Sequence, residues 1–150
     1  MKPLRTYLAL AASLLCLSTL AHAAEWQTDY NQALAQAAKE KKFVLLNFTG
    51  SDWCGYCMGM TKSVFSLPEF QEFADQNLVL VEIDFPRDKP QSPTLKAQNK
   101  RLEKKYKVEG YPTIFLLDSH GRKVADYDLE KEYDKASPAT FAKWVKKYRK

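Results

Sequence analysis

Three apolar runs along the chain predict the strands of one sheet. Phe43–Phe48 and Leu78–Asp84 are apolar almost throughout, which is typical of central strands that are covered on both faces. The third run, Thr113–Leu117, is followed by the turn residues Asp118–Arg122 and then by Lys123–Tyr127. This order predicts an antiparallel hairpin with Lys123–Tyr127 at the edge of the sheet.

Apolar residues at spacings of three and four positions predict helices between these strands. Asp29, Ser92 and Ser137 are suited to cap the first turns, and Ser92 and Ser137 each precede a proline. The last helix should bury Phe141, Trp144, Val145 and Tyr148. The predicted helices cover residues 30–40, 54–64 and 92–106. Two further helices are predicted to begin at residues 66–69 and at residues 137–138. This succession predicts an α/β fold, a central mixed β-sheet with helices on both faces.

The first 23 residues have the pattern of a secretory signal peptide. Lys2 and Arg5 precede an apolar block from Leu8 to Leu20, and Ala21-His22-Ala23 fits the small-x-small cleavage site. The block is too short to span a membrane comfortably as an anchor. We therefore expect cleavage after Ala23 or Ala24 and a single domain over residues 24–150.

The composition is that of an ordinary globular domain, with 45% apolar and 13% aromatic residues. The chain has 23 basic and 18 acidic residues, so loss of Lys2 and Arg5 with the signal peptide leaves 21 basic residues and a net charge of +3. The basic residues alternate with acids or are spaced along predicted helices. We therefore expect no nucleic-acid-binding surface.

Two cysteines, Cys54 and Cys57, remain once Cys16 has left with the signal peptide. They stand in Trp53-Cys54-Gly55-Tyr56-Cys57, between a buried strand and the start of a helix. The free N–H groups and the positive end of a helix stabilise a thiolate at its first turn. A disulfide across so short a loop constrains the unfolded chain very little. The pair is therefore interpreted as a redox site and not as a structural staple.

Two other functions remain open. The soft ligands Met58 and Met60 follow the cysteines, so the pair is also compatible with a Cu(I)-delivery protein, although methionines in an apolar helix more often pack in the core. Zinc is less suitable, because it usually takes three or four protein ligands and only the distant His120 is available after the signal peptide. The third possibility is a binding module that uses the same fold without turnover.

Three motifs resemble the thioredoxin family. The Trp-Cys-x-x-Cys motif follows a buried strand, Lys105–Thr113 resembles the loop that carries the family's cis-proline, and Phe115–Val124 resembles its last two strands. The resemblance extends over about residues 26–150. It implies a thioredoxin fold and a thiol–disulfide oxidoreductase that needs no cofactor or metal.

The resemblance also implies roles for individual residues. Cys54, exposed at the helix start, would attack a partner disulfide, and the more buried Cys57 would resolve the mixed disulfide. Pro112 would be a cis-proline that faces the disulfide and exposes the backbone of Tyr111 to an extended substrate. Beside the thiols, Trp53 and Tyr56 would form an apolar platform for a partner chain, or Trp53 would shield the loop by packing.

Asn47 departs from the family pattern. Thioredoxins usually carry a buried Asp in this strand, taken to help move the proton of the resolving cysteine, and a Lys that partners it stands where this chain has Leu80. An Asn cannot act as a base. Asp52 or a water molecule is then the candidate replacement; the other alternative is that the reverse step is slower. The proton path stays unassigned.

Further similarities point to exported relatives. Val64–Phe70 resembles exported bacterial thioredoxin-like domains, including the C-terminal domain of the periplasmic electron-transfer reductase. Gly55-Tyr56 occurs in the bacterial periplasmic disulfide isomerase, and Tyr111–Thr113 is similar to eukaryotic protein disulfide isomerase. They imply a periplasmic protein of a Gram-negative bacterium that reduces or isomerises protein disulfides and is kept reduced by a membrane or periplasmic partner. We expect it to be a monomer. The direction of electron flow remains open.

Overall fold

The computed structural model describes residues 24–149. The predicted signal peptide, residues 1–23, lies outside this range together with Cys16. Within the described range no helix is both long enough and apolar enough to cross a membrane.

In residues 24–149 five strands form one mixed sheet in the order β1-β3-β2-β4-β5. β1 and β2 run parallel to β3, while β4 is antiparallel to both β2 and β5. The bounds are β1 Trp26–Gln27, β2 Phe43–Thr49, β3 Leu78–Asp84, β4 Thr113–Leu117 and β5 Lys123–Asp126. The mixed sheet, the central place of β2 and the edge hairpin confirm the predictions. The two-residue strand β1 was not predicted, because so short a segment carries no periodicity.

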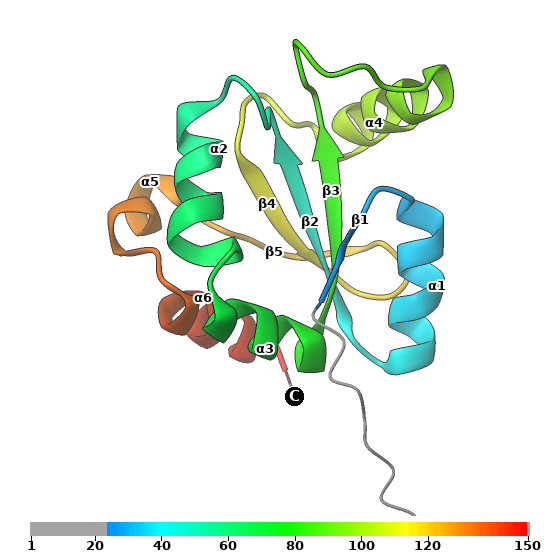
Figure 1. Cartoon of the computed structure of the whole chain (residues 1–150). Helices are drawn as coiled ribbons and strands as arrows, with labels where there is room; N and C mark the ends of the chain where they lie inside the picture. Colours follow the sequence, from blue (N-terminus) through cyan, green and yellow to red (C-terminus); the bar gives the residue numbers. More distant parts are fainter. Residues whose placement is uncertain (1–23, 150) are drawn as a thin grey trace, which may run out of the picture.

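Helices cover both faces of the sheet, with α1 and α4 on one side and α2, α3 and α6 on the other (Figure 1). Asp29, Ser92 and Ser137 cap α1, α4 and α6 as predicted, each accepting a hydrogen bond from a backbone N–H of the first turn. The bounds are α1 Tyr30–Glu40, α2 Gly55–Met60, α3 Pro68–Asn77, α4 Pro93–Tyr106, α5 Leu129–Glu132 and α6 Pro138–Lys146.

Successive residues of β2 and β3 alternate between the two sides of the sheet. Val44, Leu46 and Phe48 pack with α1 and α4, whereas Leu45 packs with α2, α3 and α6. The alternation also directs Asn47 toward α2, the helix that carries the cysteines. A polar residue of the central strand therefore faces the side of the sheet that α2 covers.

The helix that we predicted over residues 54–64 changes its winding midway. α2 ends at Met60, and Thr61–Phe65 continue it as a turn of π-helix. The Thr61 hydroxyl donates to the Cys57 carbonyl at 3.1 Å, and the Ser63 hydroxyl donates to the Gly59 carbonyl at 2.9 Å. Such back-bonding loosens the regular ladder, and the wider turn buries both Val64 and Phe65.

The segment after β5 is more ordered than predicted. It forms α5 and then a 3₁₀ turn, Tyr133–Lys135, which packs against α2. A Cβ on Gly59 would lie 2.0 Å from the Tyr133 hydroxyl oxygen, so any other residue at this position would displace the Tyr133 side chain. Tyr148, which we predicted to be buried on the last helix, lies beyond the end of α6 and is exposed.

Candidate active site

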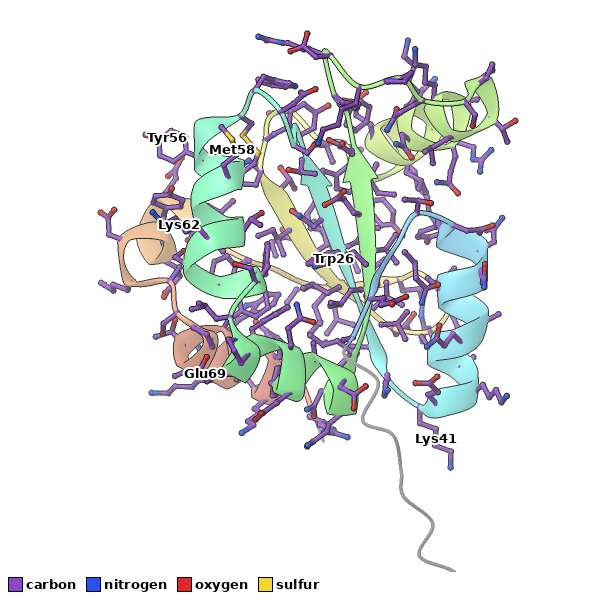
Figure 2. All side chains as sticks on the ribbon, in the orientation of Figure 1. Trp26, Lys41, Tyr56, Met58, Lys62 and Glu69 are labelled. Carbon is purple, nitrogen blue, oxygen red and sulfur yellow. A yellow bond between two sulfur atoms is a disulfide. The ribbon has the colours of Figure 1, made fainter. Side chains whose placement is uncertain are left out.

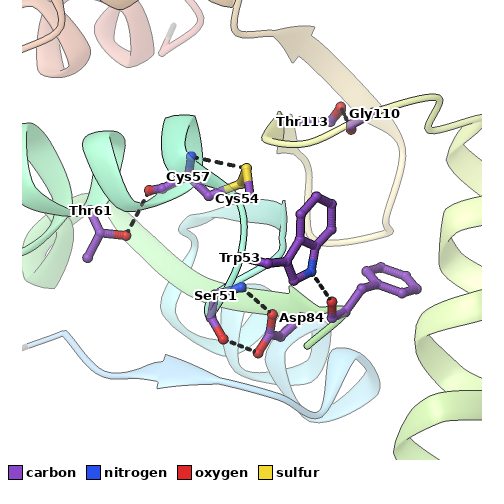
Figure 3. Close-up of a disulfide and its surroundings, with 9 residues drawn as sticks. Ser51, Trp53, Cys54, Cys57, Thr61, Asp84, Gly110 and Thr113 are labelled. Atoms are coloured by element: carbon purple, nitrogen blue, oxygen red, sulfur yellow. Dashed lines mark hydrogen bonds between the residues drawn. A yellow bond between two sulfur atoms is a disulfide. The ribbon is translucent and has the colours of Figure 1, made fainter. Parts of the chain in front are cut away.

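Cys54 and Cys57 are joined in a disulfide at the start of α2 (Figure 3). Cys54 is the N-cap residue, with extended backbone angles, and its Sγ accepts the Cys57 backbone N–H at 3.2 Å. Sulfur thus takes the place that a Ser or Asp side chain occupies at the caps of α1, α4, α5 and α6. This position favours a thiolate at Cys54 in the reduced protein, because the free N–H groups and the dipole of the first turn both stabilise negative charge.

The exposure of Cys54 is lower than expected. Its exposed fraction is 6%, against 3% for Cys57, whereas we predicted an exposed nucleophile. In the disulfide each sulfur covers part of the other, which accounts for some of the burial. The capping position distinguishes the two cysteines more clearly than their exposure does.

Trp53 fixes the loop that precedes the disulfide. Its Nε1 donates to the Phe85 carbonyl at 2.8 Å, and its ring lies edge-on to Tyr111 with centroids 5.9 Å apart. The guanidinium of Arg87 lies 4.1 Å above the ring. Of the two roles considered for Trp53, these contacts support packing that holds the active-site loop.

Asp52 is committed to a neighbouring loop. Its carboxylate accepts the backbone N–H groups of Arg87 and Asp88 at 3.0 and 2.9 Å. These hydrogen bonds, that from Arg87 first, lower the pKa of Asp52 below its ordinary value. A carboxylate with a lowered pKa is a weak base, which counts against Asp52 as the replacement for the buried acid of thioredoxins.

The loop that precedes β4 lies in the surroundings of the disulfide (Figure 3). The Tyr111–Pro112 peptide bond is cis, as expected. The Tyr111 ring stacks on Phe85 with centroids 5.1 Å apart, and its hydroxyl donates to Glu103. Burial first, and then this hydrogen bond, raise the pKa of Tyr111. These contacts fix the side chain of Tyr111 beneath the loop.

A groove of about 390 Å³ lies beside this loop. Tyr56 is 66% exposed and projects from α2 (Figure 2), with its ring edge-on to Tyr133 at 5.0 Å. Tyr56 therefore provides the apolar surface that we expected near the thiols, whereas Trp53 is held in the loop. The groove is lined by Tyr56, Tyr111, Pro112, Leu129, Glu130, Tyr133 and Asp134.

The two methionines after the cysteines differ in environment. Met58 is exposed, but Met60 is fully buried in the core between the sheet and α2, α3 and α6. Met60 therefore has the packing role that the sequence also allowed for it. Its burial counts against the Cu(I)-delivery alternative.

Asn47 is buried in β2 with an unpartnered acceptor. Its exposed fraction is 4%, and its Oδ1 has no hydrogen-bond partner within residues 24–149. The parallel register places Glu82 of β3 directly beside it, whereas Leu80 pairs with Leu45 in the core. The side chain that neighbours Asn47 is thus an acid two residues beyond the position that we compared with the family's Lys.

Glu82 lines two cavities, one with Cys57 and the other with Asn47. One cavity, of about 630 Å³, is lined by Glu82 together with Cys57 and Thr61. The other, of about 210 Å³, is lined by Glu82 together with Asn47 and Thr61. Burial first, and then the charge of Asp84, raise the pKa of Glu82 above its ordinary value of 4.5, although Lys89 acts to lower it.

Glu82 was not among the site residues predicted from the sequence. The signal was present, because Glu82 is the charged residue inside an otherwise apolar run, Leu78–Ile83. Burial disfavours a charge in a strand that is covered on both faces. A charged residue at that position therefore indicates a specific role.

We predict that Glu82→Gln stabilises the protein at neutral pH and not at acid pH. Between the unfolded value near 4.5 and the raised folded pKa, the native state binds more protons than the unfolded state. The contribution of Glu82 to stability therefore falls as pH rises through this window. The free energy of unfolding at pH 7 should rise by on the order of 1 kcal/mol, the usual cost of a partly buried, unpaired charge.

Urea unfolding of both proteins from pH 4 to pH 8 measures this difference. The exposed Glu72→Gln on α3 is the control, and it should show no gain that grows with pH. A constant difference between wild type and Glu82→Gln across this range contradicts the prediction.

Comparisons with known proteins agree with this geometry. The chain is 35% identical over 106 residues to the disulfide bond reductase DsbH of Chlamydia pneumoniae, an alignment that covers 71% of this chain and 63% of that protein. It is 33% identical over 99 residues to the thioredoxin-related protein DsbJ of the same organism, covering 66% of this chain and 28% of DsbJ. The alignments thus span less than two thirds of these relatives' own length.

Solved structures give the same result. The structure of a DsbH oxidoreductase matches 99% of this chain and 93% of its own length, with a TM-score of 0.75 and 29% identity. A thioredoxin from Thermus thermophilus matches 84% of this chain and 87% of its own, with a TM-score of 0.59 and 22% identity, and supports the fold alone. The family model described as a thioredoxin-like domain matches residues 30–148. The chain therefore belongs to the thioredoxin-like domain family.

Proposed function

We propose that the chain is an exported thiol–disulfide oxidoreductase that acts on protein disulfides as a reductant or isomerase. The observation that carries this proposal is the Cys54–Cys57 disulfide at the start of α2, with Cys54 as the helix cap and the cis Tyr111–Pro112 loop in its surroundings. The site needs no dissociable cofactor, because the two sulfurs exchange the electrons themselves.

The reaction begins with the reduced pair. The Cys54 thiolate attacks one sulfur of a substrate disulfide, so that a Cys54–substrate disulfide forms and the first substrate thiolate leaves. Cys57 then loses its proton and attacks Cys54 Sγ, which forms the Cys54–Cys57 disulfide and releases the second substrate thiolate. Two electrons pass from the cysteine pair to the substrate, and each released thiolate takes up a proton.

The substrate lies along the groove beside the cis-proline loop. The backbone of Tyr111 pairs with an extended segment of the partner, as a strand added to a sheet does. Tyr56 and Tyr133 give this segment an aromatic surface. A groove that binds mainly backbone and apolar side chains accepts many unfolded protein segments, which suits a general reductant or isomerase.

Reduction is the favoured direction. The relative DsbH is a disulfide bond reductase, and the pattern of the first 23 residues supports export to the periplasm of a Gram-negative bacterium. In that compartment the pair must be kept reduced by a membrane or periplasmic partner that supplies electrons. The chain acts as a monomer in this proposal.

The reduction potential tests this proposal. The purified domain, residues 24–150, should reduce the interchain disulfides of insulin with dithiothreitol as the electron source. Its reduction potential, measured against glutathione, should lie closer to that of thioredoxin, about −270 mV, than to that of a dedicated oxidant, about −120 mV. A potential near the oxidant value, or an absence of insulin reduction, contradicts the proposal.

A further inference from the structure

Two neighbouring strands place the acid Glu82 beside the amide Asn47. Asn47 and Glu82 are register partners on the parallel strands β2 and β3, and both line the smaller cavity under the π-turn. A neutral carboxyl group donates one hydrogen bond, and a carboxylate donates none. The buried, unpartnered Oδ1 of Asn47 can therefore accept a hydrogen bond from Glu82 only when Glu82 is protonated.

The larger cavity opens Glu82 to Cys57. Cys57, Thr61 and Glu82 line it together, and the Thr61 hydroxyl is turned to the Cys57 carbonyl (Figure 3). At about 630 Å³ with polar walls, the cavity is large enough to hold water. The cavity thus offers a proton on Cys57 Sγ a path through water to Glu82, and a general base can act through water.

We propose that Glu82 is the proton acceptor for Cys57, and that Asn47 holds the protonated acid through its Oδ1. The proposal rests on the oxidoreductase function and supplies the acid that is absent at position 47. The acid has moved to the neighbouring strand, and the central strand carries its hydrogen-bond partner.

In the resolving step the atoms and charges balance. The Cys57 S–H bond breaks and its proton goes to the Glu82 carboxylate, while the sulfur electron pair forms the new bond to Cys54 Sγ. The Cys54–substrate bond breaks, and its electron pair leaves on the substrate thiolate. Glu82 later returns its proton to this thiolate or to water, which restores the carboxylate.

Three further charged side chains line the cavity with Glu82. Asp84 lies two residues along β3, Lys62 comes from the π-turn and Lys89 from the loop after β3. The Asp84 carboxylate already accepts the backbone N–H and the hydroxyl of Ser51 at 2.9 and 2.6 Å. Glu82 is therefore the acid in this cavity that remains available to a thiol, and within residues 24–149 the smaller cavity contributes no other charged group.

The test separates the two chemical steps. The reduced domain is mixed with glutathione disulfide, quenched with acid after set times, and analysed by mass spectrometry for the glutathione adduct and for the internal disulfide. Glu82→Gln should leave the formation of the adduct unchanged and slow its resolution by about a hundredfold, the low end of a general base contribution. The rate of resolution should also lose its acid limb in the pH profile.

A relocated carboxylate provides the rescue. Asn47→Asp in the Glu82→Gln background returns an acid to the same strand pair, and resolution should recover at least tenfold. The exposed Glu72→Gln is the matched control and should resolve like the wild type. In the wild type, the Glu82 carboxyl resonance should titrate at a different pH in the reduced and the oxidised protein, because Cys57 carries a proton only when reduced.

Each outcome has a defined meaning. If wild type and Glu82→Gln resolve the adduct at the same rate and with the same pH profile, the inference is wrong and the oxidoreductase function stands. Equal slowing of both steps, or no recovery in the folded double variant, also overturns the inference. If the wild type forms no adduct at all, the proposed function itself fails.

Discussion

Cys54→Ser is expected to reduce the rate of disulfide exchange by at least about a thousandfold, whereas Cys57→Ser stops the cycle at the mixed disulfide. Cys54 Sγ occupies the cap of α2 and accepts the Cys57 N–H, so it gains most from the helix N-terminus as a thiolate. A serine hydroxyl is not ionised near neutral pH and does not attack a disulfide. Insulin reduction by the purified variants measures this loss.

The trapped adducts supply the control for this assignment. Cys57→Ser retains the nucleophile and lacks the group that releases the partner, so bands that dithiothreitol removes should accumulate with proteins of a periplasmic extract. The double variant Cys54→Ser/Cys57→Ser should form none. If Cys54→Ser trapped as many adducts as Cys57→Ser, the assignment of Cys54 as the nucleophile and Cys57 as the resolving cysteine would be wrong.

The regular parts of the fold were accessible from the sequence because their signals are local. Apolar runs marked β2 and β3, and the caps Asp29, Ser92 and Ser137 marked three helix starts that the structure confirms. A cap satisfies backbone groups within one turn, so no distant residue needs to be known.

The parts that were missed depend on contacts between distant segments or on hydrogen bonds within one turn. The π-turn forms where the Thr61 and Ser63 hydroxyls bond to carbonyls of the preceding turn, and hydrophobic periodicity does not report such bonds. The 3₁₀ turn at Tyr133 packs on Tyr56 and Gly59 of α2, more than seventy residues away in the chain. Its order arises from that packing and not from its own propensity.

The active site also has parts that the sequence predicts and parts that depend on contacts between distant segments. The cysteine pair was evident from its spacing and from the strand that precedes it, and the disulfide and cis peptide bond agree with those expectations. The neighbours of Asn47 required the register between two strands that are separated by a helical segment. The register places Glu82 beside Asn47, and not Leu80, which lies two residues earlier in β3. The neighbour of Asn47 is therefore acidic and not apolar.

Phe141→Ala should give the largest loss of stability among single substitutions outside the disulfide. The Phe141 side chain, on α6, is fully buried. The centroid of its ring lies 4.9–5.7 Å from the centroids of four other aromatic rings. These neighbours are Phe65, Phe70, Tyr127 and Trp144. Removing a buried aromatic ring costs the transfer free energy of its atoms and leaves a cavity, about 3–5 kcal/mol in total. Urea unfolding of the oxidised protein measures the change.

Tyr148→Ala is the matched control, because Tyr148 is an aromatic residue of the same C-terminal segment that remains exposed. Its substitution should change the free energy of unfolding by no more than about 0.5 kcal/mol. A small loss for Phe141→Ala would mean that the surrounding rings collapse into the cavity. Phe65 closes the π-turn and contacts Phe141, so a collapse would also move Thr61 and the wall shared by Cys57 and Glu82. The aromatic cluster therefore supports both the stability of the fold and the wall of the cavity between Cys57 and Glu82, through which we propose that the proton moves.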